Sequence, residues 1–473
     1  MSLSTRSKVS LLFSLVSMFA IIGVLVLTTV AHLSVTHAAG VTSPTSPKRM
    51  PIELAQLGSQ PPPTDAQCFA AIGLHCYSPQ QIRTAYGVTT LINNGDTGAG
   101  QTIVIIDSFG SPTIQSDLET FDAGYGLPDP PSFKVLAPLG TVPFDPTNSD
   151  MVGWAEETSL DVEWSHALAP GANIVLLTSP VDETEGVQGM PQFLQLEQYA
   201  LDHHLGNIIS QSWGATENTL FTPAGEAVFA SFEAFYLRAA LQHVTVLASA
   251  GDTGATNYEL NVSTLYSFPV VGFPASSPLV TAVGGTSLMA DTSGNYQSET
   301  VWDTTTNGGG GGISQFFHEP NYEEAHLHSS VKKELNQHRG IPDISYNADP
   351  NTSILVYISF LGPAAAGYYF IGGTSEGSPQ WAGIIADANQ LAGHPLGFLN
   401  EALYRLGDSS DAAASFHDIT VGNNNFGGVT GYNATPGWDL ASGWGTPQAE
   451  TLVTNLIKLM DRDDGLGQLS SDQ

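Results

Sequence analysis

Residues 206–252 read GNIISQSWGATENTLFTPAGEAVFASFEAFYLRAALQHVTVLASAGD, and this stretch decides the expected fold. The runs 206–214 and 244–252 are short, apolar and rich in β-branched residues, which indicates two buried strands. Between them, residues 225–243 carry apolar side chains at helical spacing, which predicts a long amphipathic helix. A strand, a helix and a second strand in this order predict two parallel strands with the helix packed on their sheet.

The same alternation extends toward the N-terminus. The apolar runs QTIVIID (101–107) and ANIVLLT (172–178) predict further strands, and residues 113–126 and 190–204 predict the helices that follow them. Strands that are apolar along their whole length are typical of a parallel sheet with helices on both faces. We therefore expect an α/β fold built on a doubly wound parallel sheet, with the active site beyond the carboxyl ends of its strands.

The charge balance excludes one class of partner and leaves two interpretations of the acidity. The 473 residues include 13 Lys and Arg against 45 Asp and Glu, a formal net charge of −32 at pH 7. A chain with so few basic residues does not neutralise nucleic-acid phosphates. The acidity is consistent with a solvated exterior, or with life at low pH, where protonated carboxylates and few bases limit positive self-repulsion. Composition alone does not separate these two interpretations.

The first 39 residues have the order of a secretory signal. Arg6 and Lys8 precede an uncharged apolar run over 9–31, and small residues follow at 38–40. The run is also long enough to span a bilayer, so a retained anchor is the alternative to cleavage near residue 38. With cleavage we expect an extracellular protein, and with retention a protein anchored to the outer face of a membrane.

The rest of the chain divides by composition. Residues 40–67 are rich in Pro, Ser, Thr and Gln and are expected to form a linker, residues 68–460 a folded domain, and the polar residues 461–473 a disordered tail. Cys68 and Cys76 are the only cysteines in the sequence. In an exported chain, two nearby cysteines most simply form one disulfide.

The tetrapeptide GGTS occurs twice, at 284–287 and at 372–375, and only one of its serines can be a nucleophile. Ser287 ends a strand-like run without a following helix pattern, so we expect a serine in a turn. Ser375 follows the strand-like GYYFIGG and precedes Pro379 and a helical pattern. Ser375 is therefore expected near a helix N-terminus, where free N–H groups and the helix dipole favour the negative charge that develops in acyl transfer.

The sequence around Ser375 resembles the nucleophile motif of subtilisins, G-T-S-x-x-x-P, but the matching histidine is missing. Asp107 stands after the first strand, where subtilisins have their catalytic Asp. None of the 13 histidines is followed by Gly-Thr, and the region where the base should lie reads EETSLDVEWSHALAP (156–170). A different group must therefore take the proton from Ser375.

Glu157 and Asp161 are four residues apart in an expected helix, so they project from the same face. Two carboxylates that close raise the pKa of one of them, which then can act as a general base at acidic pH. The alternative is a solvated acidic helix face, and Glu156 and Glu163 are competing carboxylates on the same segment.

Asp252 in SAGDTG falls at the carboxyl end of a strand, after the strand-like VTVLA (244–248). An Asp at this place can donate a hydrogen bond to an oxyanion only when it is protonated, which again requires acidic pH. An Asp in an ordinary turn is the alternative interpretation.

Together these segments resemble one family, the sedolisins or serine-carboxyl peptidases. Segments similar to those of the family follow in family order over residues 77–460: YSPQQIRTAYGV, GAGQTIVIIDSFGSP, EETSLDVEWSHALAPGANI, SQSWG, SAGDTG, FPASSP, VTAVGGTSL, GGTSEGSP and FHDIT. The resemblance implies a subtilisin-like fold in which Ser375 is the nucleophile and Glu157 the general base and then general acid. It implies that Asp161 orients Glu157 and shares its proton, and that Asp252 donates to the oxyanion. It gives no catalytic role to Asp107.

The resemblance also implies one bound Ca²⁺ ion near the C-terminus. The segments FHDIT and NATPGWDLASGWG match the family's calcium site, which implies ligation by the carboxylates of Asp418 and Asp439. The remaining ligands implied are the backbone carbonyls of Ile419, Thr435 and Gly437, a set of oxygens that suits this hard cation. Thr435 stands where the family usually has Gly, which a backbone ligand tolerates.

The sequence departs from the family pattern in two respects. The family carries a large N-terminal prodomain, whereas only residues 40–76 separate the expected cleavage site from YSPQQ, so we expect a form without that prodomain. Glu376 follows the nucleophile where the family usually has Ala, and is expected either to affect substrate choice and neighbouring pKa values or to face solvent. Trp213 in SQSWG is expected to line the substrate cleft or, equally, to be a core residue.

We therefore expect a secreted, monomeric endopeptidase that acts on proteins or peptides at acidic pH, with membrane contact only if the N-terminal segment is retained. One alternative is a neutral subtilisin-like protease with His166 as the base. Another is a non-catalytic exported binding module on the same fold. The presence of all four site residues together argues against that second alternative.

Overall fold

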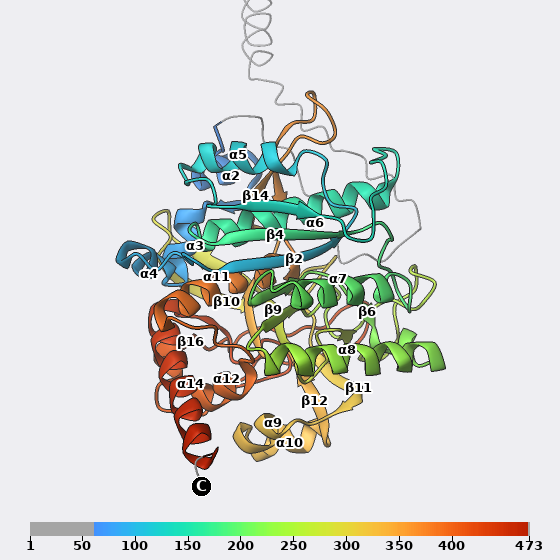
Figure 1. Cartoon of the computed structure of the whole chain (residues 1–473), viewed down its shortest axis with the longest axis vertical. Helices are drawn as coiled ribbons and strands as arrows, with labels where there is room; N and C mark the ends of the chain where they lie inside the picture. Colours follow the sequence, from blue (N-terminus) through green and yellow to red (C-terminus); the bar gives the residue numbers. More distant parts are fainter. Residues whose placement is uncertain (1–60, 472–473) are drawn as a thin grey trace, which may run out of the picture. The chain divides into compact units, whose positions relative to one another are not determined.

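The computed structural model describes residues 61–471, with side chains described as far as residue 461. Its main element is an eight-stranded sheet in the order β10-β9-β7-β5-β2-β4-β3, with β13 also paired to β9 (Figure 1). All neighbouring strands are parallel except β10 and β9, so the structure confirms the predicted parallel sheet and adds one antiparallel edge strand. The strands are β2 (Thr102–Ser108), β3 (Phe133–Leu136), β4 (Asn173–Ser179), β5 (Ile208–Gln211), β7 (Thr245–Ser249), β9 (Thr281–Ala290), β10 (Tyr296–Val301) and β13 (Ile344–Asn347).

Helices cover both faces of this sheet, as the doubly wound fold requires. Successive residues of β2 point to opposite faces, so that Ile105 lies in the core shared with α6 and α11, while Val104 lies in the core shared with α7 and α8. Figure 1 shows α7 and α8 running side by side along one face. The four helices are α6 (Ser149–Leu168), α7 (Met190–Asp202), α8 (Pro223–Leu241) and α11 (Thr374–Ala392).

A second sheet of three strands, in the order β1-β14-β15, packs on α6. The indole nitrogen of Trp164 in α6 donates to the carbonyl oxygen of Leu355 in β14 at 2.9 Å. Because β15 pairs antiparallel with β14, the strand predicted ahead of Ser375 belongs to this smaller sheet and not to the central one. The elements here are β1 (His75–Tyr77), α5 (Ile114–Tyr125), β14 (Thr352–Ile358) and β15 (Gly367–Ile371).

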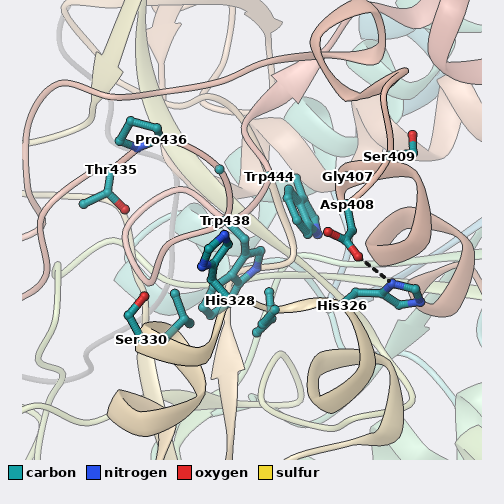
Figure 2. Close-up of a pocket in the computed structure, with 13 residues that line it drawn as sticks. His326, His328, Ser330, Gly407, Asp408, Ser409, Thr435, Pro436, Trp438 and Trp444 are labelled. Atoms are coloured by element: carbon teal, nitrogen blue, oxygen red, sulfur yellow. Dashed lines mark hydrogen bonds and ion pairs between the residues drawn. The ribbon is translucent and has the colours of Figure 1, made fainter.

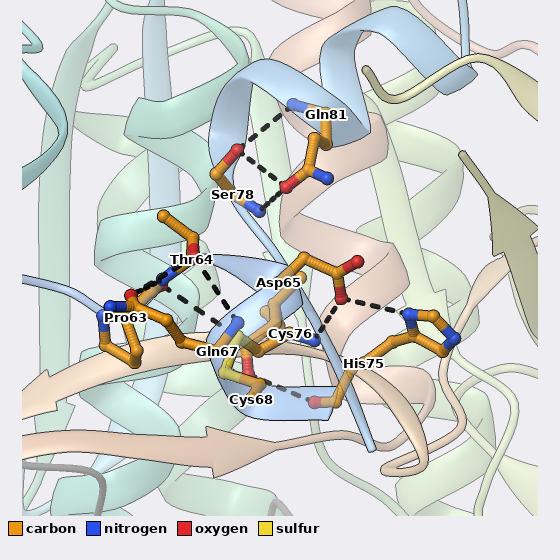
Figure 3. Close-up of a disulfide and its surroundings, with 11 residues drawn as sticks. Pro63, Thr64, Asp65, Gln67, Cys68, His75, Cys76, Ser78 and Gln81 are labelled. Atoms are coloured by element: carbon orange, nitrogen blue, oxygen red, sulfur yellow. Dashed lines mark hydrogen bonds and ion pairs between the residues drawn. A yellow bond between two sulfur atoms is a disulfide. The ribbon is translucent and has the colours of Figure 1, made fainter. Parts of the chain in front are cut away.

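The described chain begins with a capped helix, α2 (Asp65–Ile72). The Thr64 hydroxyl accepts from the backbone N–H of Gln67, and the Gln67 side chain accepts from the backbone N–H of Thr64, which is a capping box. The folded part was predicted to start at Cys68, and in the structure it starts before that residue. The predicted disulfide between Cys68 and Cys76 is confirmed and ties α2 to β1 (Figure 3). The predicted signal segment, 1–39, and most of the predicted linker lie outside the described residues.

The glycine run 308–312 passes close to other parts of the backbone. A Cβ atom on Gly309 would stand 2.6 Å from the carbonyl oxygen of Gly285 in β9, so only glycine fits there. The remaining elements are α3 (Pro79–Ala85), α4 (Val88–Asn94), β6 (Ala215–Thr216), η1 (Glu217–Leu220), β8 (Gly272–Phe273), β11 (Gly312–His318), α9 (Asn321–His326), α10 (Ser329–Leu335), β12 (His338–Ile341), α12 (Asn400–Gly407), α13 (Ala412–Ser415), β16 (Phe416–His417), β17 (Thr446–Pro447) and α14 (Ala449–Ser471).

The C-terminal helix α14 differs from the prediction at its end. It continues to Ser471, past residue 461, where a disordered tail was expected. The buried side chains Leu452, Val453 and Leu456 anchor its first turns, and each further residue then adds a backbone hydrogen bond without a new nucleation step. Within residues 61–471, none of the helices has the length and apolar character that a membrane span requires.

Candidate active site

Helix α6 carries Glu157 and Asp161 one turn apart, and both side chains are completely buried. The helix is buried from Gly153 to Leu168 because it packs against the central sheet, the second sheet and α11. This burial excludes the alternative of a solvated acidic helix face. Ser375 lies in the first turn of α11 and is also completely buried, and its hydroxyl lies close enough to the Glu157 carboxylate to lower the pKa of that group.

The buried position of the two carboxylates determines their protonation. Burial raises the pKa of Glu157 well above its usual value, the negative charges of Asp161 and Asp107 raise it further, and the hydrogen bond from Ser375 lowers it. Burial and the charge of Asp107 also raise the pKa of Asp161. The Ser212 hydroxyl donates to Oδ1 of Asp161 at 2.8 Å, which favours the ionised form of that carboxyl group. The pair therefore retains a proton well above the pH at which free carboxylic acids lose it.

Asp107 is a member of this cluster that the sequence analysis did not assign to the site. It lies in β2 and is completely buried, and its Oδ2 accepts from the Thr158 hydroxyl of α6 at 3.0 Å. Burial raises the pKa of Asp107 to about 7. The sequence does contain one signal that Asp107 belongs to this cluster. Asp107 lies near the carboxyl end of a central strand, where residues of neighbouring elements meet.

Asp252 follows β7 and is tied to the turn that carries Ser375. Its Oδ1 accepts from both the backbone N–H and the hydroxyl of Thr374, each at 2.8 Å. The Thr374 hydroxyl in turn accepts from the backbone N–H of Gly251 at 2.9 Å. Gly373 has φ +128°, and a Cβ atom there would stand 2.8 Å from Oδ2 of Asp252. The loop after β7 and the start of α11 are thus joined at the site.

The start of α11 differs from the prediction in one respect. The helix begins at Thr374, so Pro379 lies inside it and not at its first turn. Proline has no N–H to donate to the carbonyl four residues earlier, which is that of Ser375. The predicted place of Ser375 near a helix N-terminus nevertheless agrees with the structure.

Ser287, the serine of the other GGTS copy, is not part of this cluster. It lies within strand β9, not in a turn, and its hydroxyl donates to Oδ2 of Asp349 at 2.7 Å. This hydrogen bond links β9 to the segment after β13, which is a structural role.

Glu163 and His166 of α6 make contacts with other parts of the fold. The backbone N–H of Tyr357 in β14 donates to Glu163 at 2.9 Å. His166 is buried, with Nε2 at 2.7 Å from the carbonyl oxygen of Pro128 and 3.4 Å from Oδ1 of Asp122. Burial lowers the pKa of His166 to about 4. His166, which the subtilisin-like alternative required as the base, is thus engaged in contacts with Pro128 and Asp122.

Two residues near the site are core residues. Trp213 is completely buried, and its ring packs against Phe193 at 4.5 Å between centroids, which is the core alternative of the sequence analysis. Glu376 is also completely buried, which excludes the alternative that it faces solvent. The side-chain amide of Asn347 donates to Glu376 at 3.1 Å, because the side chain turns from the first turn of α11 toward β13.

The predicted calcium ligands come together around one turn. The backbone N–H of Gly437 donates to Oδ2 of Asp418 at 3.0 Å, and that of Thr435 donates to Oδ2 of Asp439 at 2.7 Å. Ile419 is buried beside Asp418. Among the side chains as far as residue 461, there is no group of three or more His, Cys, Asp or Glu that could hold a metal.

The chain is similar to two bacterial proteins over most of its length. It is 36% identical over 387 residues to kumamolisin from Bacillus sp. (strain MN-32), a match that covers 80% of this chain and 64% of kumamolisin. It is 29% identical over 392 residues to sedolisin from Pseudomonas sp. (strain 101), covering 80% of this chain and 61% of sedolisin. The chain belongs to the sedolisin family. Because the matches cover 64% of kumamolisin and 61% of sedolisin, this chain spans slightly less than two thirds of the length of either relative.

A solved structure of a sedolisin has the same fold. Pseudomonas sedolisin, a serine-carboxyl proteinase complexed with two molecules of pseudo-iodotyrostatin, superposes with a TM-score of 0.67 and 29% identity. The alignment covers 80% of this chain and 98% of that structure. No family model matches the chain. The sedolisin fold agrees with the subtilisin-like doubly wound sheet predicted from the sequence.

Proposed function

We propose that this protein is a serine-type endopeptidase that cleaves proteins or peptides at acidic pH through an acyl-enzyme. The observation that supports this most directly is the burial of Ser375 with Glu157 and Asp161. The ionisable group that interacts with the Ser375 hydroxyl in this buried site is a carboxyl group, that of Glu157, and not an imidazole. Similarity to kumamolisin and sedolisin supports the same chemistry.

In the proposed reaction, the Ser375 oxygen attacks the carbonyl carbon of the scissile bond and its proton passes to Glu157. Protonated Asp252 donates to the oxyanion, and because Thr374 donates twice to Oδ1, the proton belongs on Oδ2. The C–N bond then breaks as Glu157 protonates the leaving amine. Water attacks the resulting ester with Glu157 again accepting the proton, which releases the acid product and restores the Ser375 hydroxyl.

Asp161 sets the pH range of this reaction. It shares one proton with Glu157, and burial, together with the negative charge of Asp161 when that proton is on Glu157, keeps the pKa of Glu157 raised. A base with a raised pKa accepts a proton from Ser375 more readily than an ordinary carboxylate does. The protonated Asp252 that the oxyanion requires places the reaction on the acidic side.

The test is hydrolysis of an acid-denatured protein over a range of pH by the wild type and by matched variants. We expect maximal activity below neutral pH, and a loss of about 100-fold or more in Ser375→Ala and in Glu157→Gln. Glu156→Gln, on the same helix, is the control and should retain activity. A maximum above about pH 7, or full activity of Ser375→Ala, would contradict the proposal.

We also propose that Asp418 and Asp439 hold one Ca²⁺ ion, with the backbone carbonyls of Ile419, Thr435 and Gly437. Both carboxylates accept hydrogen bonds from backbone N–H groups of one turn, which supports the proposal, and with the three carbonyls they would give the all-oxygen ligand set that suits this ion. When bound, the ion would offset the negative charge of the two carboxylates and stabilise the turn. We expect removal of calcium by a chelator to lower the melting temperature of the wild type, and Asp439→Asn to abolish that response. An identical response in Asp439→Asn would contradict the assignment.

We further propose that the protein is exported. The buried disulfide between Cys68 and Cys76 supports this, because disulfides persist in oxidising compartments. N-terminal sequencing of the protein recovered from the culture medium tests the predicted cleavage near residue 38. Recovery only from the cytosolic fraction would contradict it.

A further inference from the structure

A cavity of about 510 Å³ lies apart from the catalytic residues, between the α9–α10 segment, the end of α12 and the loop before β17 (Figure 2). Its walls combine aromatic, acidic and basic side chains: Trp438, Trp444, Asp408, His326 and His328. None of the residues proposed for catalysis lines it. The volume is in the range of small-molecule sites in proteins.

The two indole groups of the cavity differ in their hydrogen bonding. The Trp438 nitrogen donates to the carbonyl oxygen of Pro342 at 3.1 Å, so this donor is used within the fold. The Trp444 side chain is 8% exposed, and its buried nitrogen has no acceptor among the described residues. A buried donor without a protein acceptor is uncommon and requires an explanation, such as an ordered water or a bound ligand.

Asp408 provides an acceptor on the same side of the cavity. His326 approaches one of its carboxylate oxygens, with Nδ1 at 3.3 Å from Oδ2. Figure 2 shows the other oxygen directed toward the Trp444 indole. The cavity therefore presents an N–H donor beside a carboxylate acceptor, with a second indole ring forming another part of the wall.

A hydroxyl group satisfies both partners at once, because it accepts from an N–H and donates to a carboxylate. A purely apolar ligand would leave the Trp444 N–H without an acceptor, and an anionic ligand would be repelled by Asp408. Aromatic rings pack against the C–H face of a ring that carries hydroxyl groups on its edge. We propose that this cavity binds a neutral sugar ring, as part of a glycan, at a site separate from peptide cleavage.

The test is isothermal titration calorimetry of the full-length protein with neutral trisaccharides: maltotriose, mannotriose, cellotriose and chitotriose. We expect saturable binding of at least one of them. Asp408→Asn and Trp444→Phe should each weaken that binding about tenfold or more, since each removes one of the two hydrogen-bond partners. Asp411→Asn, an exposed change outside the cavity, is the matched control and should leave binding unchanged.

Circular dichroism and hydrolysis of an unglycosylated peptide show that each variant is folded, and both should be unchanged because the catalytic residues are untouched. Absence of saturable binding by all four trisaccharides would overturn the proposal. Equal binding by wild type and Asp408→Asn would also overturn it. Because the Asp408 side chain is exposed, we expect this variant to fold normally. Tighter binding of trigalacturonic acid than of every neutral trisaccharide would assign the cavity to anions instead.

Discussion

At the scale of single residues, burial is the dominant influence on the carboxylates of the proposed active site. It is the largest cause of the raised pKa of Glu157, of Asp161 and of Asp107, ahead of the repulsion between them. Hydroxyl groups of Ser212 and Thr158 act in the opposite direction on Asp161 and Asp107. The site is thus an interior in which negative charge is limited and protons are retained.

Asp107→Asn should move the neutral-side limb of the pH profile to lower pH, by on the order of one pH unit. The ionised Asp107 raises the pKa values of Glu157 and Asp161, so its removal lowers them. Because the pKa of Asp107 is about 7, the group is uncharged in acid and the acidic limb should not move. The measurement is kcat/KM against pH, with Asp411→Asn as control. A shift toward higher pH would contradict this electrostatic role.

Glu376→Gln should stabilise the protein at neutral pH and leave its peptidase activity intact. Burial raises the pKa of Glu376 well above its usual value, so the stability it contributes is present in acid and is lost as the pH rises. The glutamine side chain does not ionise and avoids that loss. We expect a gain of about 1 kcal/mol or more at pH 7 and little change at pH 4, measured by urea denaturation.

Glu119→Gln, an exposed position on α5, is the control for this measurement and should change stability by less than about 0.5 kcal/mol at both pH values. A loss of activity in Glu376→Gln, with unchanged folding, would instead indicate a role for Glu376 in substrate binding.

Residue-level features of the site differ in how far the sequence predicts them. The spacing of Glu157 and Asp161 places them on one helix face, and the structure has them there. The roles of Asp107 and Glu376 depend on which elements pack together, because α6 lies against β2 and the first turn of α11 lies against β13. A helix or strand pattern does not carry that information.

At the scale of elements, the start of α11 is the most constrained part of the site. Gly373 combines a φ of +128° with the close approach of Asp252, and Asp252 in turn accepts twice from Thr374. This arrangement fixes the turn that presents Ser375.

Gly373→Ala should reduce activity by about 100-fold or more and destabilise the fold by about 1–3 kcal/mol. The added methyl group displaces Asp252 and strains the backbone. Gly393→Ala, at the other end of α11, is the matched control, because Gly393 also has a positive φ of +78° but has open space around its Cβ position. It should cost stability with activity retained. Comparable loss of activity in both variants would show that backbone strain alone, and not the Asp252 contact, is responsible.

Elements of the central sheet were predictable from local pattern because β2, β4, β5 and β7 are apolar runs between amphipathic helices. The local pattern also predicts the strand β15. It does not predict which sheet β15 joins, because its partner β14 is determined by the tertiary fold. Pro379 followed by a helical pattern indicates a helix start close to residue 379, whereas α11 begins at Thr374. Proline inside a helix removes one N–H and crowds the carbonyl four residues earlier, so its position alone does not mark the first turn.

At the scale of the whole molecule, buried carboxyl groups outnumber buried cations within the described residues. Arg339 is fully buried and forms ion pairs with two fully buried carboxylates, Glu323 and Asp343. Burial is the first cause of a raised pKa for the following carboxyl groups of the described part: Asp107, Asp117, Asp122, Glu157, Asp161, Glu163, Glu197, Glu217, Glu233, Glu299, Glu376 and Asp387. Such an interior favours the low-pH interpretation of the composition over that of a merely solvated exterior.

The melting temperature should therefore fall by about 10 °C between pH 4 and pH 8. Each carboxyl group with a raised pKa contributes stability below its unfolded pKa, near 4, and loses it as the pH rises through its folded value, which is about 7 for Asp107 and Glu233 and about 8 for Asp122. Two histidines oppose this trend, because burial lowers the pKa of His166 and His417 to about 4.

Differential scanning calorimetry at several pH values and two salt concentrations tests this and separates its two causes. The formal net charge of −32 at pH 7 also destabilises the fold by self-repulsion, but salt screens exposed charges and acts little on buried ones. If burial dominates, high salt at pH 8 should recover only a small part of the lost melting temperature. Full recovery by salt would assign the loss to surface repulsion, and a melting temperature that rises from pH 4 to pH 8 would contradict the role of the buried carboxyl groups.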